Sequence, residues 1–178
     1  MESELFFQLC NEKFSYLTEE FGFSYGISED DITRPCIIFE KTGFKLKIIN
    51  HVIEAPSFPI VIYIIVKEKK LINKFLKKEQ TYDLDDLLIY RKCNTQVYEY
   101  LNYENIDSFY EQIPAEKLEY YKDKYSSNDE IIIVIEKYAR LLRNYGQDVL
   151  TGNYDILPKV KKLRKEYDEK YNCGSLFI

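Results

Sequence analysis

The side chains that could carry out chemistry in this chain are few, and they do not form a catalytic pattern. The single histidine, His51, stands in the stretch INHVIEAP at the end of an apolar run. The chain contains no GxSxG, GxxxxGK[ST], GxGxxG or HExxH motif, which excludes the commonest sites that need an imidazole base or a phosphate loop. A lone histidine at a strand end is usually a surface or hydrogen-bonded residue. We therefore predict no catalytic residue.

The acidic and sulfur-containing side chains do not predict a metal site. The acids at 29–31 are adjacent, whereas a calcium loop spaces its ligands at every second residue, so a solvated turn is the better interpretation. The cysteines are scattered without a CxxC pair, at Cys10, Cys36, Cys93 and Cys173. We predict no metal and no cofactor, with these cysteines as reduced thiols, buried or half-buried, in a cytoplasmic protein.

Acids and tyrosines gather between Tyr98 and Glu130, where nine acids stand against three lysines and aliphatic residues are few. Tyrosine offers a large contact area at an interface, and acids steer the approach of a basic partner. We predict a partner-binding surface composed of Glu99, Tyr100, Tyr103, Glu104, Asp107, Tyr110 and Glu111. The alternative is that AT-rich coding supplied the tyrosines and that the acids only keep the protein in solution.

The overall charge excludes some partners. The net charge is −5 and the isoelectric point is about 5.1, which argues against nucleic acid or an anionic membrane. Residues 1–33 hold eight acids and one lysine, and they are the next candidate for the interface. The six lysines of 67–78 predict a solvated basic face. The longest apolar run, 58–66, is too short to cross a bilayer, and the acidic start differs from a signal peptide.

Hydrophobic periodicity predicts an α+β fold in a single domain, 1–178, with an N-terminal helix, an antiparallel sheet of about four strands and a C-terminal helical region. Apolar residues at steps of three and four predict the first helix, which ends at Gly22. Alternation with a period of two then predicts strands at 23–27, 37–41, 44–48 and 60–66. The short connections between these strands require antiparallel pairing.

The stretch CIIFEKTGFKLKII predicts a hairpin with a two-residue turn at Thr42 and Gly43. Glu40 then faces Lys45 and Phe39 faces Leu46, so that apolar pairs share one face. We expect Thr42→Pro to disrupt this turn if Thr42 requires a positive φ. The apolar strand 60–66 is expected to be covered on both faces.

The second half of the chain predicts helices and their ends. TYDLDDLLIYR predicts a short helix capped by Thr81 or Asp83, and Pro114 is expected to open another. SSNDEIIIVIEKYARLLRNYG predicts a long helix that begins at a capping box formed by Ser127 and Glu130 and ends at a left-handed Gly146. The polar stretch after it is interpreted as a joint between helices, with a turn at 152–153 and Asp155 as the next cap.

The stretch YARLLRNYGQDVLTGNYDILPKV, with FSYLTEEFGFS and the strand pattern between them, resembles the small bacterial immunity proteins encoded beside polymorphic and contact-dependent toxins. The shared feature is the spacing of Leu, Gly, Asp and Pro near the end, which is structural. The resemblance implies a cytoplasmic protein that binds one toxin by surface contact, and it implies no particular binding residue.

Two further functions stay open. The chain could be a small cytosolic enzyme whose carboxylate and tyrosine side chains come together from distant positions, or a plain structural subunit. A deep pocket that holds His51 beside two acids would favour the enzyme. A convex acidic face would favour binding to a basic toxin domain, and the oligomeric state is left open.

Overall fold

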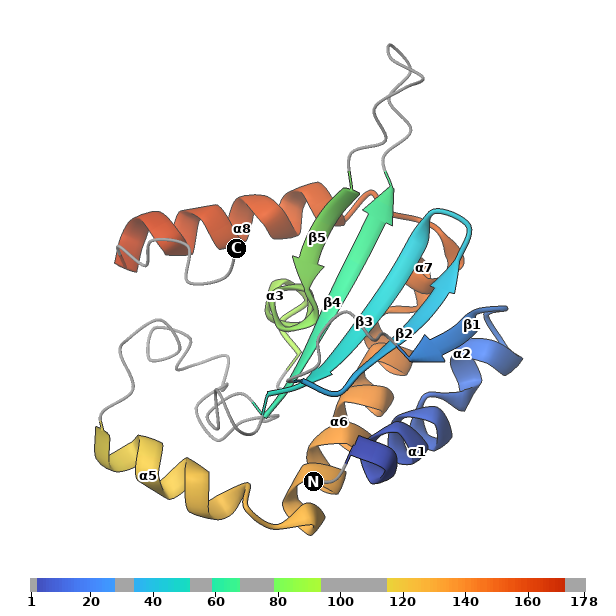
Figure 1. The fold of residues 1–178 in the computed structure, drawn as a ribbon. Helices are drawn as coiled ribbons and strands as arrows, with labels where there is room; N and C mark the ends of the chain where they lie inside the picture. The colour runs from blue at the N-terminus through green and yellow to red at the C-terminus, as the bar shows by residue number, and fades with distance from the viewer. Residues whose placement is uncertain (1–2, 28–33, 52–58, 68–78, 94–114, 172–178) are drawn as a thin grey trace.

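The strands form one antiparallel sheet in the order of the sequence. A computed structural model describes residues 3–27, 34–51, 59–67, 79–93 and 115–171. The sheet has the order β1-β2-β3-β4-β5 (Figure 1), with the strands β1 Ser24–Ile27, β2 Cys36–Lys41, β3 Phe44–Asn50, β4 Ile60–Lys67 and β5 Glu79–Asp83. The predicted α+β class is confirmed, and the sheet has five strands where about four were expected. The added strand is β5, which lies where the sequence predicted only a helix.

The register of the β2–β3 hairpin is confirmed. Phe39 lies opposite Leu46 and Glu40 opposite Lys45, and the Glu40 and Lys45 side chains form an ion pair of 3.7 Å. The turn differs from the expectation in one respect. Gly43 has a φ of 80°, whereas Thr42 is not among the residues with positive φ. The turn therefore requires glycine only at its second position.

The two faces of the sheet differ in burial. On one face, the side chains of Phe39, Leu46 and Ile64 lie in register and are fully buried beneath the helices. On the other face, Tyr63 and Ile65 are only half-buried. The prediction that β4 is covered on both faces is therefore wrong for this part of the strand, and one face of the sheet carries most of the core.

Helices from both ends of the chain cover the buried face. Figure 1 shows α1, α2 and α6 behind the sheet and α3 and α8 beside the β5 edge, and α1 packs on α6 while α3 packs on α8. The bounds are α1 Ser3–Lys13, α2 Ser15–Glu19, α3 Leu84–Tyr90, α5 Ala115–Lys124, α6 Asn128–Tyr145, α7 Gln147–Thr151 and α8 Leu157–Tyr171. None of the described helices is both long enough and apolar enough to cross a membrane.

The predicted N-terminal helix is divided into α1 and α2 at Phe14. Phe6, Cys10 and Leu17 are fully buried, whereas Phe7 and Phe21 are only partly buried. The Tyr16 hydroxyl donates a hydrogen bond of 3.0 Å to the carbonyl oxygen of Ala139 in α6. The division of the helix thus lets α2 turn its own face toward α6.

The polar stretch after α6 is a joint between helices, as expected, but its glycines have different roles. Gly146 has a φ of −106°, and a Cβ there would lie 2.6 Å from Leu142 Cδ1. Its lack of a side chain therefore permits close packing, and the predicted left-handed cap is wrong. Gly152, with a φ of 100°, is the left-handed residue. Asn153 Oδ1 accepts the N–H of Asp155 at 3.1 Å, which forms a turn ahead of α8. Because α8 begins at Leu157, Asp155 does not occupy the predicted cap position.

The predicted start of the long helix is confirmed. Ser127 is the N-cap of α6 and accepts the N–H of Asp129 at 3.2 Å. The described part of α5 starts at Ala115, and Pro114, which was expected to open a helix, lies outside the described residues. Tyr121 and Tyr125 at its end are 3% and 2% exposed, and their rings stack. Tyrosines in this acidic part of the chain therefore also belong to the core.

We predict that Gly43→Val destabilises the protein by about 1–2 kcal/mol, because valine is strained at a positive φ. Thr42→Pro is the matched variant and is expected to be tolerated, since proline suits the first central position of this turn. Thermal or urea unfolding of both variants measures the difference. An equal loss of stability in both would contradict this description of the turn.

Candidate functional site

Three aspartates meet where β5 joins α3, in the stretch YDLDD. Asp83 ends β5 and caps α3, because its Oδ1 accepts the N–H of Asp85 at 2.9 Å. Asp85 and Asp86 occupy the first turn of α3, where the helix dipole favours negative charge. Asp85 and Asp86 are 8% and 7% exposed, so they need partners within the protein.

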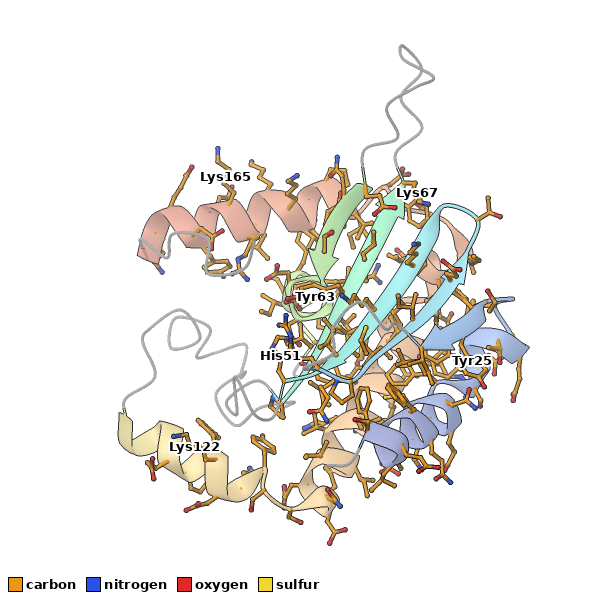
Figure 2. All side chains as sticks on the ribbon, viewed as in Figure 1. Tyr25, His51, Tyr63, Lys67, Lys122 and Lys165 are labelled. Carbon is orange, nitrogen blue, oxygen red and sulfur yellow. The ribbon has the colours of Figure 1, made fainter. Side chains whose placement is uncertain are left out.

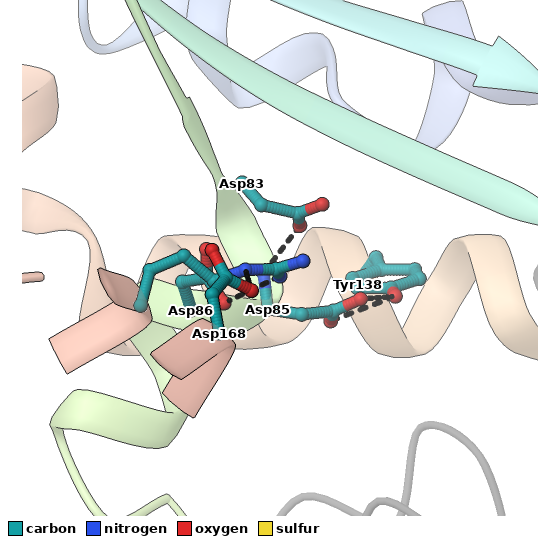
Figure 3. Close-up of polar contacts among 6 residues, drawn as sticks. Asp83, Asp85, Asp86, Tyr138 and Asp168 are labelled. Carbon is teal, nitrogen blue, oxygen red and sulfur yellow. Dashed lines mark hydrogen bonds and ion pairs between the residues drawn. The ribbon is translucent and has the colours of Figure 1, made fainter. Parts of the chain in front are cut away.

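Asp85 finds its partner in α6. The Tyr138 hydroxyl lies 2.8 Å from both carboxylate oxygens of Asp85 and donates to them, and Tyr138 is 1% exposed. Figure 3 shows this contact beside the other aspartates. The contact ties α3 to α6 in a region that solvent does not reach.

Asp86 finds its partner in α8. Arg164 Nη1 lies 3.3 Å from Asp86 Oδ1, and Arg164 Nε lies 3.0 Å from Asp168 Oδ1. One guanidinium therefore serves two carboxylates, one from α3 and one from α8 itself. The pairing attaches α8 to the β5 edge of the sheet, where Val160 is also buried.

The aspartates hold their protons more tightly than free aspartate does. Burial, with the neighbouring Asp85 charge, raises the pKa of Asp83 to about 7. Burial also raises the pKa of Asp85 to about 7, against the opposing effect of the Tyr138 hydrogen bond. The pKa of Asp86 is raised to about 7 by burial and by Asp83, and Arg164 opposes this rise. Carboxyls with such values can exchange protons near neutral pH.

A cavity of about 240 Å³ opens beside this cluster. Its lining comes from β4, β5, α3 and α8 and includes Tyr63, Asp83, Asp86, Arg164 and Asp168. Burial and the charge of Asp83 raise the pKa of the Tyr63 hydroxyl. The lining of the cavity therefore combines carboxylates and a tyrosine from distant positions, which is the arrangement expected for the enzyme alternative. Within the described residues, no group of three or more His, Cys, Asp or Glu side chains could hold a metal ion.

A second hollow, of about 640 Å³, lies at the end of the β2–β3 hairpin and includes Lys41, Lys45 and Lys67 in its lining. Each lysine has a contact within the chain. Lys41 donates to the carbonyl oxygen of Leu150, Lys45 pairs with Glu40, and Lys67 pairs with Glu79 at 3.5 Å. The carboxylates of Glu40 and Glu79 compensate the charges of Lys45 and Lys67, and a carbonyl oxygen engages Lys41. The hollow is therefore not a strong candidate for binding an anion.

The most exposed apolar surface on the sheet is strand β1. All four of its residues are exposed, and Tyr25 and Ile27 have exposed fractions of 52% and 55%. Both lie on the side of the sheet that carries Ile37 and Phe39, and the Tyr25 and Phe39 rings are 6.2 Å apart. Figure 2 shows Tyr25 at the border of the molecule, beside the N-terminal helices. Two large apolar side chains on one short edge strand indicate a contact surface.

The predicted partner-binding residues, from Glu99 to Glu111, lie outside the described residues, as do the acids at 29–31. His51 is described. It follows β3, is 9% exposed and donates its backbone N–H to the carbonyl oxygen of Pro59 at 2.8 Å. It is therefore buried, and it does not line the cavity beside the aspartates. Cys10, Cys36 and Cys93 are buried and lie outside any disulfide of the described residues.

Sequence reasoning missed the aspartate cluster. It gave Thr81 or Asp83 as the cap of this helix, of which Asp83 is the observed cap, and it assigned no role to Asp85 or Asp86. The available signal was the presence of three acids within four residues at a single helix start. An exposed helix start with the same residues would be unremarkable, so only the packing of α6 and α8 distinguishes this one.

Comparison with known proteins does not identify the chain. No protein-family model matches it, and no curated protein or solved structure gives a significant match.

We predict that the aspartate cluster makes the free energy of unfolding fall as pH rises. Because the folded pKa values, about 7, lie above the ordinary 3.8, the folded state binds more protons between these values. The stabilisation is complete below about pH 4 and is lost as pH rises through about 7. Urea unfolding between pH 5 and pH 8 should show a shallower pH dependence in Asp85→Asn. Asp155→Asn, at an exposed position, is the control and should leave the slope unchanged.

We also predict that Tyr138→Phe destabilises the protein by about 1–3 kcal/mol, because it removes a buried donor and leaves Asp85 without it. The loss of unfolding free energy caused by Tyr138→Phe should be smaller when Asp85→Asn is already present, since the two residues share one interaction. Unfolding of the two single variants and the double variant measures this coupling. Strict additivity would contradict the contact described here.

Proposed function

We propose that this chain is a protein-binding module that neutralises a basic bacterial toxin domain in the cytoplasm by direct contact. The observation that carries the proposal is strand β1, which exposes Tyr25 and Ile27 within a strongly acidic part of the chain. Exposed apolar side chains surrounded by charge are typical of surfaces that meet another protein. The layout resemblance to immunity proteins supports the same function.

Charge favours a basic partner over other classes. Residues 1–33 contain eight acids and one lysine, and Glu4, Glu12, Glu19 and Glu20 are all exposed on α1 and at the end of α2. Their field would accelerate association with a positively charged domain, as acidic inhibitors of basic enzymes require. The acidic and tyrosine-rich segment 98–111 would extend this surface or form a second one.

An enzyme is the second candidate, and the cavity lined by Asp83, Asp86 and Tyr63 is the observation that favours it. Carboxyls with raised pKa values are typical of acid–base catalysts. Against this, Asp86 is already paired with Arg164, and the Asp83 carboxylate caps α3. These contacts account for the aspartates as structural residues, so we favour binding.

The proposal is tested with the protein encoded beside this chain in its genome. Co-expression should relieve growth arrest caused by that protein, and purified chain should inhibit it at a ratio near one to one. Inhibition by contact saturates at that ratio, whereas an enzyme acts at far lower amounts. Neutralisation at substoichiometric amounts that is lost in Asp86→Asn would favour the enzyme.

We predict that replacing N-terminal glutamates with lysines slows the association of the chain with its basic partner. Glu4→Lys combined with Glu19→Lys should lower the association rate by roughly three- to tenfold at low salt and flatten its salt dependence, because steering depends on unscreened charge. Glu166→Lys combined with Glu169→Lys, at exposed positions on α8, makes the same charge change elsewhere and is the control.

The same measurement with Glu104→Lys, Asp107→Lys and Glu111→Lys locates the surface. If this triple variant slows association and the N-terminal pair does not, segment 98–111 is the main interface. If neither set changes the rate, charge steering is not part of the function. The melting temperature should change little in all three sets, because these acids are not expected to be structural.

A further inference from the structure

Strand β1 has an outer edge that faces away from the rest of the sheet. In the described part of the chain, β1 has one neighbouring strand, β2. Figure 1 shows it at the border of the sheet, next to α2. A strand at an edge presents backbone N–H and C=O groups that can pair with another extended chain.

The register identifies which backbone groups face outward. Asn50 donates its N–H to the carbonyl oxygen of Pro35 at 2.9 Å, so the odd-numbered residues of this segment direct their backbone toward β3. Ile38 and Glu40 must then direct theirs toward β1, because backbone direction alternates along a strand. Their partners are Gly26 and Ser24. The N–H and C=O groups of Tyr25 and Ile27 therefore point away from β2.

These same two residues carry the exposed side chains described above. Tyr25 and Ile27 project their side chains on the face of the sheet occupied by Ile37 and Phe39, and more than half of each side chain is exposed. An added strand would meet backbone groups at the edge and apolar side chains on one face. Gly26, between them, is exposed, and no atom of the described residues lies within 4 Å of its Cβ position, so the described part of the chain does not cover the other face of β1.

We propose that β1 accepts an extended, basic segment of the partner protein as a sixth strand of the sheet. This inference rests on the proposed function for the class of partner. Main-chain pairing would supply affinity through the two outward N–H and two outward C=O groups. Lysine or arginine side chains of the added strand would be attracted by the exposed acids of α1 and α2, such as Glu19. Figure 1 shows α2 next to β1.

Charge decides between this occupant and a second copy of the chain. Pairing of two copies through β1 would bring together two N-terminal regions with eight acids and one lysine each. Such juxtaposition of like charges opposes association. A basic segment gains the same backbone hydrogen bonds and has favourable electrostatics, so it is the occupant that the surroundings of β1 select.

The test uses the full chain and a ten-residue peptide in which lysine and valine alternate. Titration followed by amide resonances should shift those of Ser24 to Ile27 first. A peptide with glutamate in place of lysine, and a lysine–valine peptide N-methylated on adjacent residues so that both of its edges are blocked, should each bind at least about fivefold more weakly. The N-methylated control leaves the protein unchanged and so does not depend on any variant folding.

A matched pair of variants isolates the backbone contribution. Ile27→Ala removes the apolar side chain and keeps the outward N–H, whereas Ile27→Pro removes both and leaves the bonds to β2 in place. The proline variant should bind the lysine–valine peptide about five- to tenfold more weakly than the alanine variant. Thermal unfolding of both variants checks that the sheet persists.

Several results would overturn the inference. The first is that millimolar lysine–valine peptide shifts no amide resonance of β1. The second is that either control peptide binds as tightly as the lysine–valine peptide. The third is that the two Ile27 variants bind the lysine–valine peptide with equal affinity. Dimerisation of the chain that Ile27→Pro abolishes would assign the edge to a second copy. If the chain inhibits the protein encoded beside it, and the Ile27→Pro and Ile27→Ala variants inhibit that protein equally strongly, only the edge inference fails. If β1 binds the peptide and no inhibition occurs, only the proposed function fails.

Discussion

The register of β2 against β3 is the constraint on which the rest of the molecule depends. Phe39, Leu46 and Ile64 align across three strands only in this register, and a shift by one residue would turn each strand's buried side chains toward the opposite face. The same register places the Glu40–Lys45 ion pair on the less covered face. Because α1, α2 and α6 pack against the apolar side, the hairpin determines which face they cover.

The β5–α3 junction has a comparable role at the other edge. β5 pairs with β4, and its last residue caps α3, so the direction of the strand sets the direction of the helix. Asp85 and Asp86 then connect that helix to Tyr138 of α6 and Arg164 of α8. Burying acids is costly unless they are hydrogen-bonded or paired. The arrangement therefore favours one relative position of three helices over others with similar apolar contact.

Much of the fold could be predicted from local patterns. The hairpin was predicted residue by residue because its alternating apolar residues, its Glu40–Lys45 pair and its Thr-Gly turn all specify the same register. The long helix α6 and its Ser127 cap followed from periodicity with a start signal. The β5 strand was missed because EQTYD is short and polar, and its pairing with Lys67 and Tyr63 depends on long-range contact. The prediction of a left-handed conformation at Gly146 was wrong. Glycine is required there by close packing on Leu142, and sequence alone does not distinguish that requirement from a positive φ.

The candidate sites were harder to predict for a physical reason. An aspartate at a helix start is usually solvated, and whether Asp85 and Asp86 are buried depends on α6 and α8, which lie more than forty residues away along the chain. The exposure of Tyr25 and Ile27 was equally difficult to predict, because a strand covered by helices and a strand at the edge of the sheet have the same alternating pattern. Only the order of strands reveals that β1 lies at an edge.

The position of β1 has a consequence for the order in which the molecule opens. The strand has four residues, a single strand neighbour among the described residues, and no buried side chain of its own. Amide hydrogens of such a segment exchange by local fluctuations that cost far less than global unfolding. A partner that pairs with β1 would suppress these fluctuations and raise the stability of the chain by mass action. Slower amide hydrogen exchange in β1 would then report that the partner is bound.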